Sequence, residues 1–292
     1  MKILITGASG LLGWNVAGRA RDEHDVLGTW LHHKPPLNQA ARVDLTKRHA
    51  TSAVFREFQP QLVIHTAAMT HADLCEKDPA SARALNVEAT AHLAQLCEGS
   101  GARIIYISTD LVFDGKKGMY TEADEASPIS RYGETKLLAE IEVARTLENH
   151  VILRASLMYG KSLSGRRAAD EVILTAQKEG RTLRLFTDEF RTPVCVPGLA
   201  DVILKLVDND ATGLYHCAGS ERMSRYEFAQ RLAKYVPLEM DKILPARIAD
   251  IPVIPPRAPD VSLDTAKLRE TLAVKLPDID EGLSLLHFKN RS

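Results

Sequence analysis

The chain opens with a strand pattern, a glycine turn and a helix pattern, and this arrangement constrains its fold more than any other feature. Residues 2–6 form an aliphatic run typical of a buried strand, and residues 11–21 carry the spacing of an amphipathic helix. Gly7, Gly10 and Gly13 follow the spacing G-x-x-G-x-x-G at the junction. Glycines also mark ordinary tight turns, but directly before a helix they let a pyrophosphate approach the backbone and the helix N-terminus. The sequence therefore predicts a dinucleotide site at this first turn.

The alternation of strand and helix patterns continues to about residue 155. The predicted strands are residues 2–6, 26–30, 62–66, 103–108 and 151–154. The predicted helices are residues 11–21, 46–58, 79–99 and 130–147. Such alternation is typical of a parallel sheet with crossover helices, so the expected fold class is α/β, a Rossmann-type doubly wound parallel sheet. Sheets of this kind bind ligands at the carboxyl ends of their strands.

Beyond residue 155 the alternation stops, and prolines gather between Pro237 and Pro259. This composition is typical of loop-rich structure. A helix after Gly198 and a strand over residues 213–217 still resemble core elements that return to the main sheet. The expected division is a dinucleotide-binding domain of residues 1–155 plus about 190–217, and a second, smaller, discontinuous substrate domain of about 156–189 and 218–292.

Charge and composition limit the classes of partner. The 292 residues include 37 Lys and Arg against 38 Asp and Glu, a formal net charge of -1. Without a basic surplus, neither nucleic acid nor an anionic membrane surface is an expected partner. The apolar runs are shorter than the roughly 18 residues that a membrane span needs, and the first residues lack a signal-peptide pattern. We therefore expect a cytoplasmic protein.

Cysteine and histidine usage predicts neither disulfides nor a metal site. His65 and His71 stand without a carboxylate or second histidine at ligand spacing, so we expect no metal. The cysteines are scattered without C-x-x-C spacing, and we interpret them as reduced core thiols. They are Cys75, Cys97, Cys195 and Cys217.

The residues after the second predicted strand favour NADP over NAD as the dinucleotide. A carboxylate about 20 residues after the glycines would hold the ribose 2′-hydroxyl of NAD. The sequence has none there, whereas His32, His33 and Lys34 are able to contact a 2′-phosphate. A solvated basic turn is the plainer interpretation of the same residues, and NAD stays open.

Tyr132 and Lys136 are four residues apart in a predicted helix and therefore share one face. A tyrosine with a pKa of about 10 exchanges protons reluctantly at neutral pH, and a nearby lysine cation lowers that pKa. Thr109 follows the strand 103–108, where we expect its hydroxyl to polarise a substrate carbonyl, with Ser108 the weaker candidate. Such tyrosine–lysine pairs also occur by chance on solvated helices. Together with the glycine turn, however, they predict hydride and proton transfer to a carbonyl.

Longer strings extend these motifs to a family resemblance. The glycine spacing resembles the extended branch of the short-chain dehydrogenase/reductase superfamily. Further strings look like the dTDP-4-dehydrorhamnose reductase family, namely residues 108–115, 127–128, 132–137, 190–194, 257–259 and 263–264. The resemblance covers nearly the whole chain. It implies reduction of the 4-keto group of a deoxy-sugar nucleotide by NADPH or NADH, with the nucleotide sugar held between two domains.

Motifs and resemblance together assign the candidate site. The catalytic residues are Thr109, Tyr132 and Lys136. The cofactor-binding residues are Gly7, Ser9, Gly10, Leu11, Leu12, Gly13, His32, His33, Lys34, Asp44, Leu45, Thr66, Ala67, Ala68, Tyr132, Lys136 and Ala155. The substrate-binding residues are Thr109, Asp110, Leu111, Leu157, Arg191 and Arg257. Asp44 is equally typical of a helix N-cap. The two arginines suit substrate phosphates, or else surface salt bridges.

The sequence departs from the family pattern at two positions that face the sugar in the family. Leu111 stands where rhamnose-pathway reductases have an aromatic residue, and Leu157 stands where they have a tryptophan. Dehydratases of the superfamily carry Thr-Asp-Glu, whereas here Thr109 and Asp110 precede a leucine, which favours simple reduction. Without the glutamate of the dehydratases, we interpret Asp110 as a polar contact of the substrate. A different keto-sugar nucleotide therefore stays open as the substrate.

A second class of function also stays open. The same family resembles the regulatory subunit of methionine adenosyltransferase, which keeps the fold and the cofactor pocket while serving as a binding partner. Residues 213–216, 223–227 and 263–264 are compatible with that branch. In this interpretation the chain is a non-catalytic, NADP-binding regulatory subunit. A homodimer is compatible with both interpretations.

Overall fold

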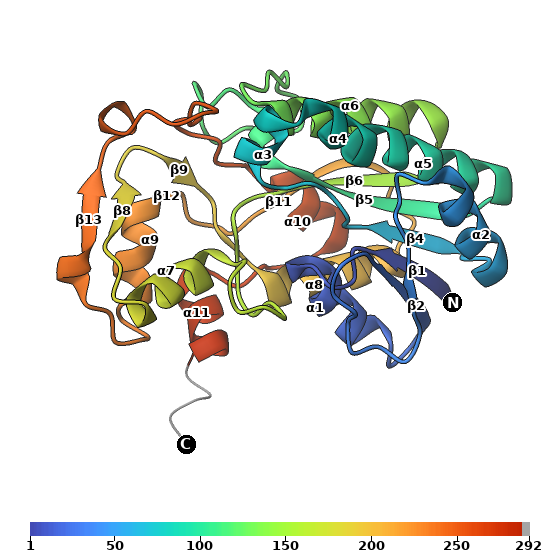
Figure 1. Cartoon of the computed structure of the whole chain (residues 1–292), viewed down its shortest axis with the longest axis horizontal. Helices are drawn as coiled ribbons and strands as arrows, with labels where there is room; N and C mark the ends of the chain where they lie inside the picture. Colours follow the sequence, from blue (N-terminus) through green and yellow to red (C-terminus); the bar gives the residue numbers. More distant parts are fainter. Residues whose placement is uncertain (288–292) are drawn as a thin grey trace.

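The computed structural model describes residues 1–287, and a seven-stranded parallel sheet forms its centre (Figure 1). The strand order is β11-β6-β5-β4-β1-β2-β3, and every neighbouring pair is parallel. The strands are β1 (Lys2–Thr6), β2 (Asp25–Trp30), β3 (Ala40–Arg42), β4 (Leu62–His65), β5 (Arg103–Thr109), β6 (His150–Ala155) and β11 (Gly213–Cys217). The order reverses between β1 and β4, where sheets of this type bind their ligands. The predicted Rossmann-type α/β fold is confirmed.

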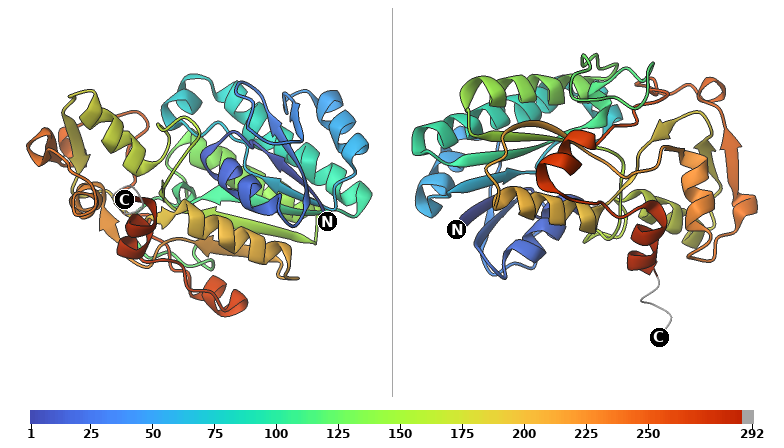
Figure 2. Two further views of the ribbon diagram at one scale, coloured as in Figure 1. Left: turned by 90° about the horizontal axis from the view of Figure 1, so that it is seen from below. Right: turned by 180° about the vertical axis from the view of Figure 1, so that it is seen from behind.

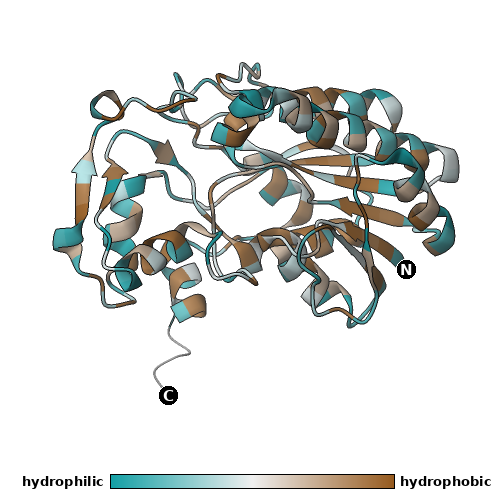
Figure 3. Cartoon of the chain, in the orientation of Figure 1, coloured by the Kyte–Doolittle hydropathy of each residue, from teal (hydrophilic) through white to brown (hydrophobic). Residues whose placement is uncertain are grey.

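Helices cover both faces of the sheet because the strands are apolar on both sides. In β5, Ile105 and Ile107 belong to one core cluster, while Ile104 and Tyr106 belong to another, as a period of two requires. The first cluster is covered by α1 (Leu11–Ala20), α8 (Val196–Val207) and α10 (Ala266–Leu272). The second is covered by α2 (Arg48–Phe58), α5 (Ala89–Ser100) and α6 (Arg131–Thr146). Figure 3 shows the apolar residues concentrated in the strands between these layers.

The predicted helix over residues 79–99 is interrupted in the structure. The segment runs through α4 (Pro79–Arg83) and a π-helical turn, η1 (Ala84–Glu88), into α5, and a separate short helix, α3 (Ala72–Lys77), precedes it. The π-helical turn places Asn86 inside, where it bonds the backbone N and O of Met69 at 2.8 and 3.1 Å. Asn86 also donates to the Thr135 hydroxyl at 3.0 Å. This side chain therefore ties the segment after β4 to α6.

A smaller unit is assembled from segments that leave the sheet and return to it, on the left in Figure 1. Its two-stranded sheets pair β7 (Met158–Tyr159) with β10 (Val194–Cys195), β8 (Leu183–Phe186) with β13 (Ile243–Ala246), and β9 (Phe190–Arg191) with β12 (Met223–Ser224). Its helices are α7 (Ala169–Lys178), α9 (Arg225–Leu232) and α11 (Ile279–His287), with short 3-10 turns η3 (Met240–Lys242) and η4 (Ile248–Asp250). These elements share a core of their own that includes Tyr159, Phe228 and Leu283.

Packing differs from the predicted domain ranges at two places. α10 falls in the predicted second domain, but its Leu268 packs into the core of the main sheet, and Figure 2 shows the helix lying against that sheet. β9 falls in the predicted range 190–217, but it pairs with β12 of the smaller unit. We therefore propose a division in which α10 joins the dinucleotide unit and β9 joins the smaller one. Residues 288–292, the end of the predicted second domain, lie outside the described residues.

Two further expectations concern the core and the membrane. The four cysteines are buried and free, which agrees with their interpretation as core thiols. Within residues 1–287, no helix combines the length and the apolar character that crossing a membrane requires.

Candidate active site

The glycine turn packs closely against the end of β4. Gly7 has a φ of +68°, and a Cβ at this position would stand 2.8 Å from the Cα of Ala67. A Cβ at Gly13 would collide with the Gly7 carbonyl. The Gly10 amide donates to the Gly7 carbonyl at 2.8 Å and so closes the turn. The turn requires glycine at residue 7 both for its conformation and for the close approach.

At this turn α1 presents an open N-terminus. Its N-cap, Gly10, supplies no side-chain acceptor, and within the described chain the first turn carries no acidic residue. The amides of Leu11, Leu12 and Gly13 therefore lack intrahelical acceptors, and the helix dipole favours an anion beside them. Ser9 lies in the same turn. The structure thus brings together the residues of the predicted pyrophosphate site.

The predicted ribose-side segment lies against this turn. Thr66 donates through its hydroxyl to the carbonyl of Thr6 at 2.6 Å, and the Ala67 amide donates to the Thr6 hydroxyl at 3.3 Å. Ala68 follows directly. The small side chains of this segment leave the backbone accessible at the carboxyl ends of β1 and β4.

A basic turn follows β2. His32, His33 and Lys34 are all exposed. Arg42, on the neighbouring strand β3, adds a further cation: its guanidinium lies 5.8 Å from the ring centroid of Trp30, with which it is in register. Sequence reasoning missed Arg42 because it considered only the residues that follow β2. Parallel pairing of β3 with β2 is what brings this residue beside the turn.

The acidic residue after β3 does not cap a helix. Asp44 Oδ1 accepts hydrogen bonds from the Thr46 hydroxyl at 2.6 Å and from the Thr46 amide at 3.0 Å, and these bonds lower the pKa of Asp44. The N-cap of α2 is Lys47, so the N-cap interpretation is wrong. Leu45 is buried in a small core cluster.

Tyr132 and Lys136 lie on the buried face of α6, as their spacing predicts. The N-cap of the helix is Ser130, whose hydroxyl accepts from the Gly133 amide. Lys136 Nζ donates to the carbonyl of Ile107 at 2.6 Å and stands 4.1 Å from the ring centroid of Tyr106. Lys136 is therefore held under β5, at a carbonyl two residues before Thr109.

Burial dominates the protonation of both groups. It raises the pKa of Tyr132, the charge of Asp110 raises it further, and a hydrogen bond with Thr109 opposes them. Burial lowers the pKa of Lys136 to about 7, against the charge of Glu140. The net shift of the Tyr132 pKa is therefore upward, whereas we expected Lys136 to lower it. Tyr132 is held as a neutral phenol.

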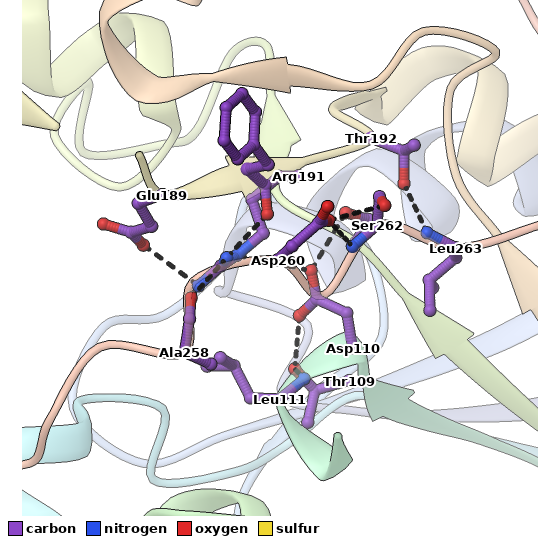
Figure 4. A network of polar contacts seen from close by, with 12 residues as sticks. Thr109, Asp110, Leu111, Glu189, Arg191, Thr192, Ala258, Asp260, Ser262 and Leu263 are labelled. Atoms are coloured by element: carbon purple, nitrogen blue, oxygen red, sulfur yellow. Dashed lines mark hydrogen bonds and ion pairs between the residues drawn. The ribbon is translucent and has the colours of Figure 1, made fainter. Parts of the chain in front are cut away.

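Thr109 ends β5 at the carboxyl edge of the sheet, in register with Ala155 of β6. Its hydroxyl donates to Asp110 Oδ1 at 3.1 Å and accepts from the Leu111 amide at 3.2 Å (Figure 4). The other oxygen of Asp110 accepts from the Ser156 hydroxyl at 2.9 Å. The hydroxyl hydrogen of Thr109 is thus directed at Asp110, whereas we expected it to point at a substrate carbonyl.

Arg191 is a buried link between the two units, drawn in Figure 4. Its guanidinium donates to Glu189 Oε1 at 2.9 Å and to the carbonyls of Phe190 and Ala258 at 2.8 and 3.2 Å. Its Nε lies 3.7 Å from Asp110 Oδ2. These donors are used inside the protein, which differs from both expected roles, the phosphate contact and the surface salt bridge.

A cleft of about 360 Å³ opens beside Leu111. Its lining comes from His71, Ala72, Asp73, Leu111, Ile129, Ser130, Arg191, Val253, Ile254, Pro255, Pro256, Arg257 and Ala258. The cleft therefore brings together three of the predicted substrate residues. Leu157 is not among them, because it packs against the core of the smaller unit.

Arg225, at the start of α9, is a basic residue that sequence reasoning missed. Burial lowers the pKa of Arg225, and the charges of Glu189, Arg191, Arg257 and Asp110 act on it. Among the described residues, the side chains of Arg225 and Arg257 form no hydrogen bond or ion pair. These two guanidinium groups retain donors for an anionic ligand.

His65, considered above as a metal ligand, is fully buried. Its ring nitrogens bond the hydroxyls of Thr6 and Thr90 at 2.6 and 2.8 Å. Burial and the charge of Lys136 lower the pKa of His65 to about 3, so the ring is neutral. The part of the chain that the structure describes holds no cluster of three His, Cys, Asp or Glu side chains suited to a metal ion.

Comparison with known sequences places the chain in a family. Residues 1–289 match the family model of the RmlD substrate binding domain. A probable low-salt glycan biosynthesis reductase, Agl14, of Haloferax volcanii is 31% identical over 98% of this chain and 97% of its own length. The methionine adenosyltransferase 2 subunit beta of Xenopus laevis is 34% identical over 92% of this chain and 82% of its own.

Solved structures agree with this placement. The dTDP-4-dehydrorhamnose reductase of Bacillus anthracis, solved in complex with NADP, has a TM-score of 0.89 and 26% identity, with 99% of both chains covered. The corresponding reductase of Clostridium acetobutylicum has a TM-score of 0.89 and 29% identity, with 100% of both chains covered.

Proposed function

The chain belongs to the RmlD substrate binding domain family, within the extended short-chain dehydrogenases/reductases, and from this premise we propose that it is an NAD(P)H-dependent reductase of the 4-keto group of a deoxy-sugar nucleotide. One observation carries the proposal. Thr109, Tyr132 and Lys136 lie at the carboxyl edge of the sheet that also carries the glycine turn. The relatives described as reductases support the same activity.

The first turn fits the phosphates of a dinucleotide. Gly7 lets the turn close against Ala67 at the end of β4, and the amides at the start of α1 offer donors to an anion. A nicotinamide dinucleotide bound there supplies the hydride. The relative from Bacillus anthracis was solved with NADP, and the exposed side chains of His32, His33 and Lys34 together with Arg42 suit a 2′-phosphate. NADP is therefore the proposed cofactor, and NAD is compatible with the same turn.

Tyr132 is the proposed proton donor. Its raised pKa keeps the phenol protonated at neutral pH, as a general acid requires. When the carbonyl is reduced, the Tyr132 proton passes to the new alkoxide oxygen. Lys136, fixed by its bond to the carbonyl of Ile107, places its ammonium beneath this site and orients the ribose next to the nicotinamide.

The cleft beside Leu111 is the proposed sugar site. Leu111, Ile129 and Val253 make part of its lining apolar. Arg257 borders the same cleft, and the charge of Arg257 acts on the nearby Arg225. We assign the substrate phosphates to these two arginines, since arginine offers a planar fork that matches phosphate oxygens.

The test is turnover. Purified protein is mixed with NADPH and dTDP-4-dehydrorhamnose, and the loss of NADPH absorbance is followed. We expect steady oxidation of NADPH, and we expect Tyr132→Phe to lower kcat by about 10²–10⁴ while cofactor binding is retained. Tyr215→Phe is the matched control, because Tyr215 is a residue of β11 that packs in the core of the main sheet. A loss within a few-fold for Tyr132→Phe contradicts its role as the proton donor.

A second candidate function is a cofactor-binding regulatory subunit. It is favoured by the 34% identity to the methionine adenosyltransferase 2 subunit beta of Xenopus laevis. Both functions require the cofactor, so cofactor binding does not distinguish them. Turnover of a sugar nucleotide does. A protein that binds NADPH but reduces no member of a panel of 4-keto-6-deoxy sugar nucleotides is a binding subunit. In that case a methionine adenosyltransferase catalytic subunit is expected to co-migrate with it in size-exclusion chromatography.

A further inference from the structure

The last residue of β2 is a tryptophan, at the place where an NAD-binding sheet has its carboxylate. That carboxylate stands about 20 residues after the glycines and binds the ribose 2′-hydroxyl. Trp30 stands at this spacing from Gly10. The end of β2 also lies beside the glycine turn, because the Ala8 amide donates to the Thr29 carbonyl at 2.9 Å. The position that distinguishes riboses in such sheets is therefore occupied here by an indole ring.

Arg42 of β3 is the cation that the sheet places beside this ring. Parallel pairing puts Arg42 in register with Trp30, so both side chains leave the same face of the sheet. The guanidinium carbon lies 5.8 Å from the centroid of the ring. Its Nε donates to the carbonyl of Leu31 at 3.0 Å. These two contacts hold the guanidinium next to the first residue of the turn that follows β2.

The terminal amino groups of this guanidinium remain available. Arginine carries five N–H donors, and the Leu31 carbonyl uses the one on Nε. Arg42 is exposed, and no carboxylate among residues 1–287 pairs with it. A guanidinium that is anchored through Nε keeps its two Nη groups as a planar fork, and this fork matches two oxygens of a phosphate.

The turn over residues 32–34 is less well prepared to bind a phosphate. Its three side chains are exposed, and within the described chain none of them forms a hydrogen bond or an ion pair. A free side chain loses its rotamer freedom when it binds a ligand. Arg42 is already held by two contacts, so it loses less of this freedom. Of the basic groups at this edge, Arg42 is therefore the preorganised one.

We propose, on the basis of the proposed function, that Arg42 is the residue that selects NADP over NAD, by binding the 2′-phosphate of the adenosine ribose through its two Nη groups. The main determinant of cofactor choice then lies on β3, beside the turn to which the sequence pattern assigned it. NAD has a hydroxyl in place of this phosphate, so it offers Arg42 no ionic partner.

The test is direct binding, in which isothermal titration calorimetry measures the affinity of the purified protein for NADPH and for NADH. We expect Arg42→Met to weaken the binding of NADPH by about 10- to 100-fold, as expected for the loss of hydrogen bonds to a charged group. The affinity for NADH should change by less than about threefold. Arg42→Lys keeps the charge without the fork, so it should recover part of the affinity for NADPH.

Arg56→Met is the matched control. Arg56 is an exposed arginine whose Nε also donates to a backbone carbonyl, that of Ser52, at 3.3 Å. It lies in the last turn of α2, which leads from the carboxyl end of β3 back to the start of β4, at the opposite edge of the sheet from Trp30. This variant should bind both cofactors as wild type does. Thermal unfolding without ligand checks that each variant is folded.

Two smaller ligands separate the phosphate contact from the rest of the cofactor. Adenosine 2′,5′-bisphosphate and adenosine 5′-monophosphate differ only in the 2′-phosphate. Wild type should prefer the bisphosphate, and Arg42→Met should bind the two within about threefold of each other. These titrations need no turnover. A protein that selects NADPH through Arg42 but reduces no sugar nucleotide refutes the proposed reductase function and leaves the role of Arg42 standing.

Three results overturn the role of Arg42. The first is a wild type that binds NADPH no better than NADH. The second is an Arg42→Met variant that keeps the wild-type preference for NADPH. The third is a Lys34→Met variant that loses more of this preference than Arg42→Met does, which assigns the 2′-phosphate to the turn after β2.

Discussion

Lys136 combines a buried position with a pKa lowered to about 7. In the unfolded chain the lysine pKa is about 10.4, so the folded protein releases this proton first. Between these two values the unfolded state binds more protons, and the free energy of unfolding therefore rises with pH by up to about 1.4 kcal/mol per pH unit. Lys136→Met removes the group. We expect urea unfolding from about pH 7 to about pH 9 to show a rise in wild type that is smaller in this variant.

The control for this prediction is Lys205→Met, at an exposed lysine on α8. This variant should keep the wild-type dependence on pH. Stability curves for wild type and Lys136→Met that stay parallel over the range would contradict the lowered pKa of the buried lysine.

Gly7 offers a second prediction at the residue scale. Gly7→Ala forces a Cβ into the space next to Ala67 at a φ of +68°, and we expect it to cost about 1–3 kcal/mol of stability and to weaken NADPH binding. Gly18→Ala on α1 is the matched control, because a Cβ there meets no atom of the described residues within 4 Å. It should be neutral or stabilising by up to about 1 kcal/mol. Thermal unfolding with and without NADPH measures both effects. Equal losses in the two variants are incompatible with the close approach.

The sequence predicts those site residues that lie close together along the chain. The glycine turn needs only a strand before it and a helix after it, and Tyr132 and Lys136 need only one helix. Arg42 and Arg225 depend on contacts between distant segments, and no local pattern marks them. The Thr109 hydroxyl donates to Asp110, its neighbour in the chain. Asp110 is in turn held by Ser156 and Arg191, which are distant in sequence.

At the scale of elements, α6 is fixed to the sheet by a buried ion pair. Glu140 on α6 accepts from Arg154 of β6 at 2.7 and 3.0 Å, and also from the Ser108 hydroxyl of β5. Glu140→Gln leaves the Arg154 charge buried without its partner, so we expect a loss of about 3–5 kcal/mol. Urea unfolding measures the loss.

The matched control is Glu142→Gln, two residues further along α6. Glu142 pairs with Arg145 at 2.6 Å on a more exposed part of the helix. Exposed pairs contribute little, so the expected loss is below about 1 kcal/mol. Similar losses for the two variants would mean that the buried pair does not fasten the helix.

The elements themselves were largely predictable, for physical reasons that differ along the chain. The strands 103–109 and 213–217 carry mostly buried residues because helices cover both of their faces. The π-helical turn η1 was not predicted, because Asn86 is placed by bonds to Met69 and Thr135, far away in sequence. The proposed move of α10 to the dinucleotide unit has the same physical reason. Its place is set by Leu268 in the core beneath β11.

At the scale of the molecule, the chain passes between the two units several times. β9 lies in the smaller unit, α8 and β11 lie in the main one, and Arg191 with Asp110 bridges the two. Neither unit is a continuous stretch of chain. We therefore expect a single unfolding transition, in which tryptophan fluorescence and far-UV circular dichroism change together. Both tryptophans, Trp14 and Trp30, lie in the main unit, so fluorescence reports that unit alone. Separate midpoints would show that the smaller unit unfolds independently.

The two walls of the cleft have different freedom to change over evolutionary time. On one side stands Leu111, next to the residues that handle the proton. On the other runs the loop over residues 253–258, where Ile254 is 78% exposed. Substitutions at residues 253–256 of that loop are expected to reshape the cleft without disturbing Thr109, Tyr132 or the bonds of Asp110. A lineage with this architecture can acquire a new sugar by drift in one loop while its redox chemistry is inherited intact, and directed evolution of substrate range should begin with the same residues.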